Sequence, residues 1–260
     1  MASIFRDRLL ADKTAFVTGG SSGIGLRIAE RFAEHGARVV IAGRKPEKLD
    51  LARAGIELYG VARTVALDVR DYGAVQAALR RTFDEFGPVD ILVAGAAGNF
   101  PAPVTGMSAN GFKAVIDIDL LGTFNTVRAA HEFLRRPGSS VLAISAAHAT
   151  VPLAWQAHVC AAKAGVELLI KTLAIEWGPD GVRCNCLTPG PTADTEGMRR
   201  LAPTKDAEER VASSVPLGRF GTKDELADLA LFLSSDAASY ITGATFVCDG
   251  GQSLSRAGLV

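Results

Sequence analysis

The sequence has no excess of either charge, because its 28 lysine and arginine residues balance 28 aspartate and glutamate residues. The basic residues are scattered along the chain, whereas a nucleic-acid-binding protein gathers them into a patch or stripe. No apolar run approaches the roughly 20 residues that a membrane-spanning helix needs. We therefore expect neither a nucleic acid nor a membrane as a partner.

The sequence also lacks familiar targeting signals. Residues 1–12 mix Arg6 and Arg8 with scattered apolar side chains and contain no unbroken apolar stretch like that of a secretory signal. Residues 256–260 do not read as a peroxisomal Ser-Lys-Leu terminus. From these features we expect a cytoplasmic protein.

Cysteine is scarce, and its four occurrences match no zinc-binding spacing. Cys184 and Cys186 are separated by one residue, so they do not form a CxxC pair. We expect reduced thiols that pack as small hydrophobic groups, and no metal site.

Apolar β-branched runs alternate with stretches of helical periodicity along the chain. Several runs are continuous in Val, Ile and Leu, which is typical of parallel strands covered on both faces. The alternation predicts an α/β protein with a three-layer doubly wound parallel sheet (Rossmann fold), in a single domain over residues 1–260. The expected strands are 14–18, 38–42, 62–67, 90–94, 139–145, 182–187 and 245–248. The expected helices are 24–35, 46–54, 72–86, 109–135, 154–177 and 223–233.

Residues 192–216 interrupt this alternation and are rich in proline, threonine and charge. The segment follows the carboxyl end of a predicted strand, where binding loops of such sheets lie. We therefore expect an irregular insertion that acts as a substrate lid.

A glycine-rich turn from Thr18 to Gly25 follows the first predicted strand and leads directly into a helix. Glycine lets the backbone turn sharply and lets a pyrophosphate approach the helix N-terminus, whose free N–H groups favour an anion. A glycine pattern alone is a weak signal, but this strand–turn–helix context makes it a strong one. We expect a dinucleotide here, bound by Gly19, Ser21, Ser22, Gly23, Ile24 and Gly25.

The end of the second predicted strand distinguishes two dinucleotides. NAD-binding folds place an acidic residue there to hold the ribose 2′-hydroxyl. This sequence instead has Gly43, Arg44 and Lys45, with no carboxylate. The planar guanidinium of Arg44 suits a 2′-phosphate, so we predict that the cofactor is NADP(H).

The spacing Thr18-Gly-x-x-x-Gly-x-Gly25 resembles that of the short-chain dehydrogenase/reductase family, and the similarity covers nearly the whole chain. Lys163 falls where the family has the lysine of its Tyr-x-x-x-Lys motif, and Asn185, Gly243 and residues 249–251 match its later motifs. The resemblance implies further cofactor contacts at Asp68, Val69, Ala96, Lys163, Pro189, Gly190 and Thr192.

Two residues of the family's catalytic set are missing. Val159 stands at the tyrosine position and Ala146 at the serine position, while Asp119 replaces the family's usual asparagine. In the family the tyrosine protonates a carbonyl oxygen during hydride transfer, and neither valine nor alanine can do so. Ordinary ketone–alcohol chemistry by that route is therefore not expected.

One branch of the family, the NADPH-dependent 2,4-dienoyl-CoA reductases, lacks this pair. The sequence resembles its peroxisomal type in residues 96–100, 112–119, 122–125, 176–179, 189–191, 195–197 and 199–201. In that branch an aspartate at the position of Asp119 and the lysine polarise a water molecule. The resemblance thus implies an enzyme of fatty acid metabolism that reduces an acyl-CoA substrate.

The expected chemistry follows from the conjugated substrate. Hydride adds to the far end of the diene, and negative charge develops on the thioester oxygen as a dienolate, which needs a hydrogen-bond donor. The resemblance places Asn99 at that oxygen, and Asp119 and Lys163 around the water that protonates carbon. Phe100, Arg199 and Arg200 are the expected substrate-binding residues, the arginines through CoA phosphates.

His148 leaves other functions open. It lies three residues beyond Ser145, where the mitochondrial type of dienoyl-CoA reductase has a catalytic tyrosine, and an imidazole there could donate a proton. A carbonyl reductase that uses His148 or water is therefore an alternative, as is a non-catalytic NADP(H)-binding protein. Family members are commonly tetramers built through two long helices, so we expect a homotetramer formed by residues 109–135 and 154–177.

Overall fold

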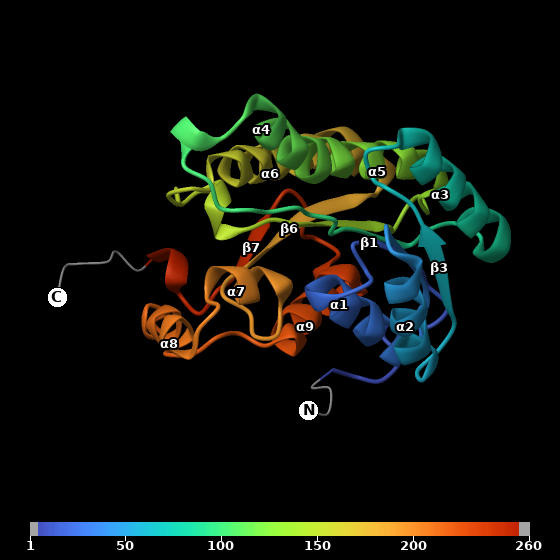
Figure 1. The fold of residues 1–260 in the computed structure, drawn as a ribbon. Helices are drawn as coiled ribbons and strands as arrows, with labels where there is room; N and C mark the ends of the chain where they lie inside the picture. The colour runs from blue at the N-terminus through green and yellow to red at the C-terminus, as the bar shows by residue number, and fades with distance from the viewer. Residues whose placement is uncertain (1–4, 255–260) are drawn as a thin grey trace.

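Seven parallel strands form one sheet in the order β3-β2-β1-β4-β5-β6-β7 (Figure 1). The computed structural model describes residues 5–254, so the C-terminal residues 256–260 discussed above lie outside it. All seven expected strands are present, with ends shifted by at most two residues. Their bounds are β1 (Thr14–Thr18), β2 (Arg38–Gly43), β3 (Ala62–Ala66), β4 (Ile91–Ala94), β5 (Ser140–Ile144), β6 (Arg183–Pro189) and β7 (Thr245–Cys248).

Helices cover both faces of the sheet, as Figure 1 shows. One layer consists of α1 (Gly23–Glu34), α2 (Pro46–Glu57) and α9 (Lys223–Ser234). The other consists of α3 (Tyr72–Phe86), α4 (Ala109–Val115), α5 (Gly122–Ala130) and α6 (Ala157–Trp177). The predicted three-layer doubly wound fold in a single domain is confirmed.

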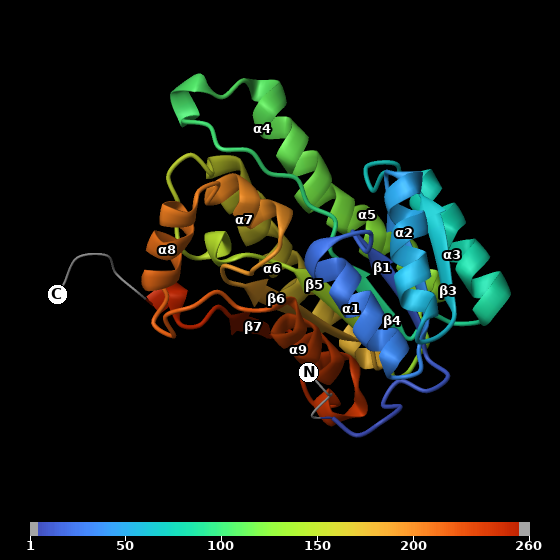
Figure 2. The ribbon, with the colours of Figure 1, turned by 60° about the horizontal axis from the view of Figure 1, so that its bottom comes forward.

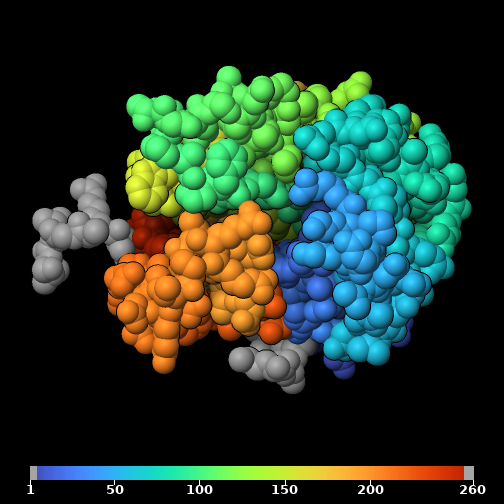
Figure 3. Space-filling view, in the orientation of Figure 1, coloured from blue at the N-terminus to red at the C-terminus, as the bar shows by residue number. Residues whose placement is uncertain are grey.

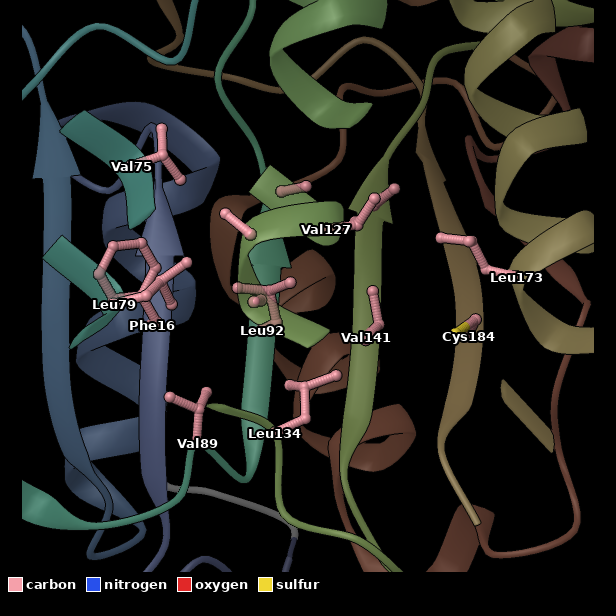
Figure 4. Packing of buried hydrophobic residues seen from close by; sticks show 14 of the residues in the cluster. Phe16, Val75, Leu79, Val89, Leu92, Val127, Leu134, Val141, Leu173 and Cys184 are labelled. Atoms are coloured by element: carbon pink, nitrogen blue, oxygen red, sulfur yellow. The ribbon is translucent and has the colours of Figure 1, made fainter. Parts of the chain in front are cut away.

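Each central strand is buried on both faces, which explains the continuous apolar runs. In β1, Phe16 points into the core shared with α3 and α5, while Ala15 and Val17 point into the core under α1 and α9. Figure 4 shows the first of these cores, with Phe16, Leu92 and Val141 on three neighbouring strands. The sheet therefore forms a rigid floor, and its carboxyl edge carries the loops of the site.

The expected helix 109–135 is interrupted. Residues Ile116–Leu121 form a π-helical turn between α4 and α5, and the helix gives way to a 3-10 turn at His131–Phe133. The hydroxyl of Thr123 donates to the carbonyl oxygen of Asp119 at 2.6 Å in this widened turn. Such turns are rare and often occur at functional sites.

The segment 192–216 is more ordered than expected, because it contains α7 (Glu196–Leu201) and α8 (Lys205–Ser213). Each helix is capped by a threonine hydroxyl that accepts a backbone N–H, Thr195 for α7 and Thr204 for α8. Figure 2 shows the two helices side by side, at the end of the domain away from α2 and α3. Their role as a lid stays a prediction.

Candidate active site

A cleft opens at the carboxyl ends of β1 and β4, where the strand order reverses (Figure 3). In Figure 3 it separates the orange segment that contains α7 from the blue N-terminal part of the chain. The cavity has a volume of about 420 Å³. Its walls include nine of the predicted cofactor residues: Gly19, Ser21, Ser22, Ile24, Gly25, Arg44, Asp68, Val69 and Ala96.

Two glycines of the glycine-rich turn stand where a side chain would not fit. A Cβ on Gly19 would lie 2.5 Å from the carbonyl oxygen of Gly95, and a Cβ on Gly25 would lie 2.4 Å from that of Gly19. Ser22 is the N-cap residue of α1, but its side chain makes no capping hydrogen bond, and the first turn of the helix has no acidic residue. The N–H groups of this helix end are thus open to an anion from the cavity.

Three cations line one end of the cavity: Arg44, Lys45 and Lys48. Within the described residues, Arg44 is exposed and makes no ion pair. Asp68, also in the wall, is engaged by Arg70 at 2.7 Å, and this hydrogen bond holds the pKa of Asp68 below its usual range. The cationic end and the uncapped helix together suit a molecule with several phosphates.

Five of the predicted cofactor residues do not line this cavity: Gly23, Lys163, Pro189, Gly190 and Thr192. Thr192 is buried, and its hydroxyl donates to the carbonyl oxygen of Gly190 at 3.0 Å. Gly190 follows directly from the end of β6 and packs against Asp249. These residues form a compact turn beyond β6, and their contact with a cofactor stays a prediction.

The structure brings Asp119 and Lys163 together. Lys163 on α6 places Nζ 3.2 Å from Oδ2 of Asp119, and donates a hydrogen bond of 3.0 Å to the carbonyl oxygen of Ile144. Oδ1 of Asp119 accepts the N–H of Gly98 at 2.7 Å, which orders the loop that carries Asn99. Asp119 is 1% exposed and Lys163 6%. Burying two opposite charges is costly, so such pairs are more typical of functional sites than of stable cores.

The positions of the family's tyrosine and serine hold no proton donor. Val159 is buried in a small apolar cluster with Val115 and Ala162. The three tyrosines of the chain lie elsewhere: Tyr59 and Tyr240 are exposed, and the ring of Tyr72 lies under Arg128. No phenol can therefore replace the missing one.

Several buried polar atoms around this region lack hydrogen-bond partners within the described residues. The ring of His158 packs 4.5 Å from that of Phe100 and is fully buried, a contact that was not predicted from the sequence. Buried groups of this kind are seldom left unpaired, so a ligand or water is their natural partner. The atoms without a hydrogen bond are Asn99 Oδ1, His148 Nδ1 and Nε2, Gln156 Oε1, His158 Nδ1 and Nε2, and Asp119 Oδ2. Of these, Asp119 Oδ2 has the Lys163 ammonium as an ion-pair neighbour.

His148 lies in the turn after β5 and is part-buried. Burial, and then the positive charge of Lys163, lower the pKa of His148 below its usual value. The imidazole is therefore neutral at neutral pH, able to donate a hydrogen bond but a poor reservoir of protons.

A second cavity of about 370 Å³ adjoins the first and shares Ser22 and Arg44 with it. Its walls include Asn99, Phe100 and Arg200. Arg200 donates to the backbone carbonyl oxygen of Asn99 at 3.0 Å, so α7 is held against the Asn99 loop. Arg199 does not line the cavity, and its side chain is 70% exposed beside Glu196.

No metal site is evident in residues 5–254, because no three side chains of His, Cys, Asp or Glu are grouped to hold an ion. Burial raises the pKa values of the Cys184 and Cys186 thiols to about 12, so both are inert at neutral pH. No helix in that range is long and apolar enough to cross a membrane.

The turn at Gly19–Gly25, the cleft at the strand-order reversal and the lysine on α6 define a dehydrogenase-type site. A family model described as enoyl-(acyl carrier protein) reductase matches residues 19–253. The chain belongs to the short-chain dehydrogenase/reductase family and is an oxidoreductase with a nicotinamide cofactor, as the sequence predicted.

Relatives and solved structures agree with this assignment. The peroxisomal 2,4-dienoyl-CoA reductase of Danio rerio is 44% identical over 98% of this chain and 86% of its own length. A probable 2,4-dienoyl-CoA reductase of Bacillus subtilis is 42% identical over 93% of this chain and 97% of its own. The crystal structure of a short chain dehydrogenase from Bacillus anthracis superposes with a TM-score of 0.84 at 41% identity, covering 93% of this chain and 96% of that one.

Proposed function

We propose that the protein reduces a conjugated 2,4-dienoyl-CoA thioester to an enoyl-CoA with NADPH. The observation that carries this proposal is the buried pair of Asp119 and Lys163, in a site where Val159 and Ala146 replace the family's tyrosine and serine. A carbonyl substrate needs a proton on oxygen, which this site does not offer. A dienoyl thioester needs a proton on carbon, and the printed names of the relatives support that substrate.

The cleft suits NADPH by its shape and charge. The space beside Gly19 and Gly25, the uncapped start of α1 and the cation Arg44 match a pyrophosphate and a 2′-phosphate. Bound there, the dinucleotide would supply the hydride. Lys163, Pro189, Gly190 and Thr192 would hold its nicotinamide end.

Residues of the site would then stabilise the developing negative charge and supply the proton. Asn99 would donate a hydrogen bond to the thioester oxygen, where negative charge develops as the dienolate forms. Asp119 Oδ2 has no hydrogen-bond partner of its own and lies beside the ammonium of Lys163. We infer that these two groups hold the water that protonates the dienolate carbon, with the ammonium increasing the acidity of that water.

The second cavity is the proposed site of the CoA moiety. Arg200 lines it directly and Arg44 stands at its junction with the cofactor cavity, so both can meet phosphates. Phe100 lines it and offers an apolar wall for the acyl chain. The sequence predicts this role for both Arg199 and Arg200; we assign it to Arg200 alone, because Arg199 does not line the cavity.

The alternative functions are less well supported. A carbonyl reductase that uses His148 as the acid would need a protonated imidazole, and burial works against that form. A non-catalytic binding protein has no need of a buried Asp119–Lys163 pair, which is costly to maintain.

The test is NADPH oxidation by the purified protein with trans-2,trans-4-decadienoyl-CoA, beside trans-2-decenoyl-CoA and simple ketones. We expect turnover of the dienoyl thioester and at least about a hundredfold lower kcat/KM for the ketones, which lack a route for protonation on oxygen. Turnover of ketones alone would favour the carbonyl reductase, and no turnover at all would favour the binding protein. Either result would overturn the proposal.

We also propose that the protein is a homotetramer. Large apolar side chains are exposed on both helices: Phe124 on α5, and Leu168 and Ile175 on α6. A subunit interface would remove this apolar surface from water. Light scattering on the purified protein should give about four times the mass of one chain, and Leu168→Glu should reduce it. A monomeric wild type would contradict this proposal.

The cytoplasm remains our proposed location, although the relatives from Danio rerio and Rattus norvegicus are named peroxisomal. Microscopy of the full chain with a fluorescent protein on its N-terminus tests this. A diffuse signal is expected, and a punctate one would contradict it.

A further inference from the structure

The helix that carries Lys163 also carries a second buried carboxylate. Glu167 is on α6, one turn after Lys163, and is only 7% exposed. Its Oε1 atom accepts two hydroxyl hydrogen bonds, from Ser145 Oγ at 2.7 Å and from Thr188 Oγ1 at 3.2 Å. Both hydroxyls come from buried residues, one just after β5 and one within β6.

These contacts join the three elements that surround the proposed nicotinamide end. Lys163 binds the carbonyl oxygen of Ile144, and Glu167 binds the hydroxyl of the next residue, Ser145. Positions four apart on a helix lie on one face, so consecutive turns of α6 hold consecutive residues at the end of β5. The hydrogen bond from Thr188 connects Glu167 to β6 as well. The last residue of β6, Pro189, leads into the turn that is predicted to contact the cofactor.

Hydrogen bonding alone does not require a charge at this position. A glutamine could accept the same two hydroxyls at a lower cost of burial than an ionised carboxylate. The charge does act on its surroundings: burial is the main cause of the raised pKa of the Cys186 thiol, Glu167 raises that pKa further, and Lys163 lowers it. Glu167 and Lys163 are four residues apart on α6, so they lie on the same face of the helix.

We propose that Glu167 is a positioning residue, whose negative charge keeps the Lys163 ammonium protonated and whose hydroxyl contacts align the ends of β5 and β6 beneath it. Asp119 in the π-helical turn pairs with the same ammonium. Lys163 thus has one buried carboxylate as its ion-pair partner and a second one turn further along its own helix. The role in turnover rests on the proposed function, whereas the effect on the protonation of Lys163 does not.

Other titratable groups face this pair from every element packed on it. They are Asp119 in the π-helical turn, His148 after β5, Cys186 in β6 and Lys171 on α6 itself. Burial lowers the pKa of His148 and raises that of Cys186 to about 12. Neither group therefore changes its charge at mildly alkaline pH.

The direct test is the titration of Lys163 in Glu167→Gln by carbon NMR of protein labelled at lysine Cε, without cofactor or substrate. The Lys163 signal is assigned with Lys163→Met. We expect the Lys163 signal to titrate at lower pH in Glu167→Gln than in the wild type, because a negative charge one helical turn away is lost in a buried setting. Glu176→Gln, on the exposed side of the same helix, should leave the titration unchanged. An unchanged titration in Glu167→Gln would overturn the proposal.

Two further variants test whether a loss of folding explains the result, and a kinetic measurement tests the role in turnover. Glu167→Met is a second neutral variant if the glutamine variant does not fold, and Glu167→Asp should restore most of the Lys163 titration. If both neutral variants fail to fold while the aspartate variant folds, the carboxylate is needed for folding and not for the protonation of Lys163. That result overturns the proposal. With an active wild type, Glu167→Gln should lower kcat about tenfold at alkaline pH, with KM for the thioester within twofold. An inactive wild type would refute the proposed function and leave the NMR result to decide this one.

Discussion

Oδ2 of Asp119 lies 3.2 Å from Nζ of Lys163, in a part of the site that solvent barely reaches. The carboxylate comes from a π-helical turn and the ammonium from α6, so two helices fix the distance between them. Oδ1 of Asp119 is engaged by the N–H of Gly98, which leaves Oδ2 as the oxygen open to a further partner. The proposed protonation of the dienolate depends on this pair.

Arg44 should determine the choice of cofactor. Arg44→Asp removes the guanidinium that we assign to the 2′-phosphate and adds a carboxylate suited to a ribose hydroxyl. We expect the ratio of kcat/KM for NADPH to that for NADH to fall at least about a hundredfold. A charge-assisted pair with the 2′-phosphate is lost, and the new carboxylate repels that phosphate.

Arg53→Asp, on the exposed side of α2, is the matched control and should leave the ratio within twofold. A ratio that stays constant in Arg44→Asp would refute the NADPH assignment.

The glycine-rich turn permits a comparison of two glycines with the same type of backbone. Gly19 has φ of +72° and Gly23 has φ of +59°, but only at Gly19 would a Cβ meet backbone atoms, at 2.5 Å. Gly19→Ala should therefore destabilise the protein by about 1–3 kcal/mol more than Gly23→Ala, because overpacking is added to backbone strain. Denaturant unfolding of both variants measures this difference. Equal losses would mean that the turn is not packed as described.

Arg200 and Arg199 are neighbours with different surroundings. Arg200 lines the second cavity and binds the carbonyl oxygen of Asn99, whereas Arg199 points away from it. Arg200→Ala should raise KM for a CoA thioester about tenfold, the effect of losing one charge-assisted contact. Arg199→Ala should change it less than twofold in the same assay. Equal effects would place the CoA moiety elsewhere.

His148 should make the protein sensitive to acid. Because burial lowers its pKa in the folded protein, the unfolded chain takes up the proton first as pH falls below about 6.5. Stability is therefore fully present above that pH and declines below it. The fall in Tm between pH 7.5 and 5.5 should be smaller in His148→Gln than in the wild type. Parallel pH profiles would contradict the buried state of this side chain.

The strands and the cleft were predictable, but several site features were not. The apolar runs of β1 and β4 reveal strands because both faces are buried, and the turn at Gly19–Gly25 reveals a cleft because Gly19 and Gly25 leave no room for a side chain. The widened turn around Asp119 has no comparable signal, since one extra residue per turn barely changes the helical periodicity.

The helices α7 and α8 were missed because their stability depends on threonine caps at Thr195 and Thr204, while their short polar sequences resemble a loop. His158 and Glu167 escaped notice for a different reason. Their importance comes from burial against partners distant in the chain, Phe100 for one and Thr188 for the other. A single sequence carries no record of such contacts.

The most direct test of the central claim is the activity of Asp119→Asn on trans-2,trans-4-decadienoyl-CoA, together with its affinity for NADPH from fluorescence titration. The asparagine keeps the size of the side chain but cannot form the ion pair with Lys163. Asp117→Asn, in the same π-helical turn but paired with Lys113 at the surface, is the control. We predict that Asp119→Asn loses at least about a hundredfold in kcat, the usual scale of general acid–base assistance, and binds NADPH within threefold of the wild type. Full turnover by this variant would remove Asp119 from the mechanism and contradict the account.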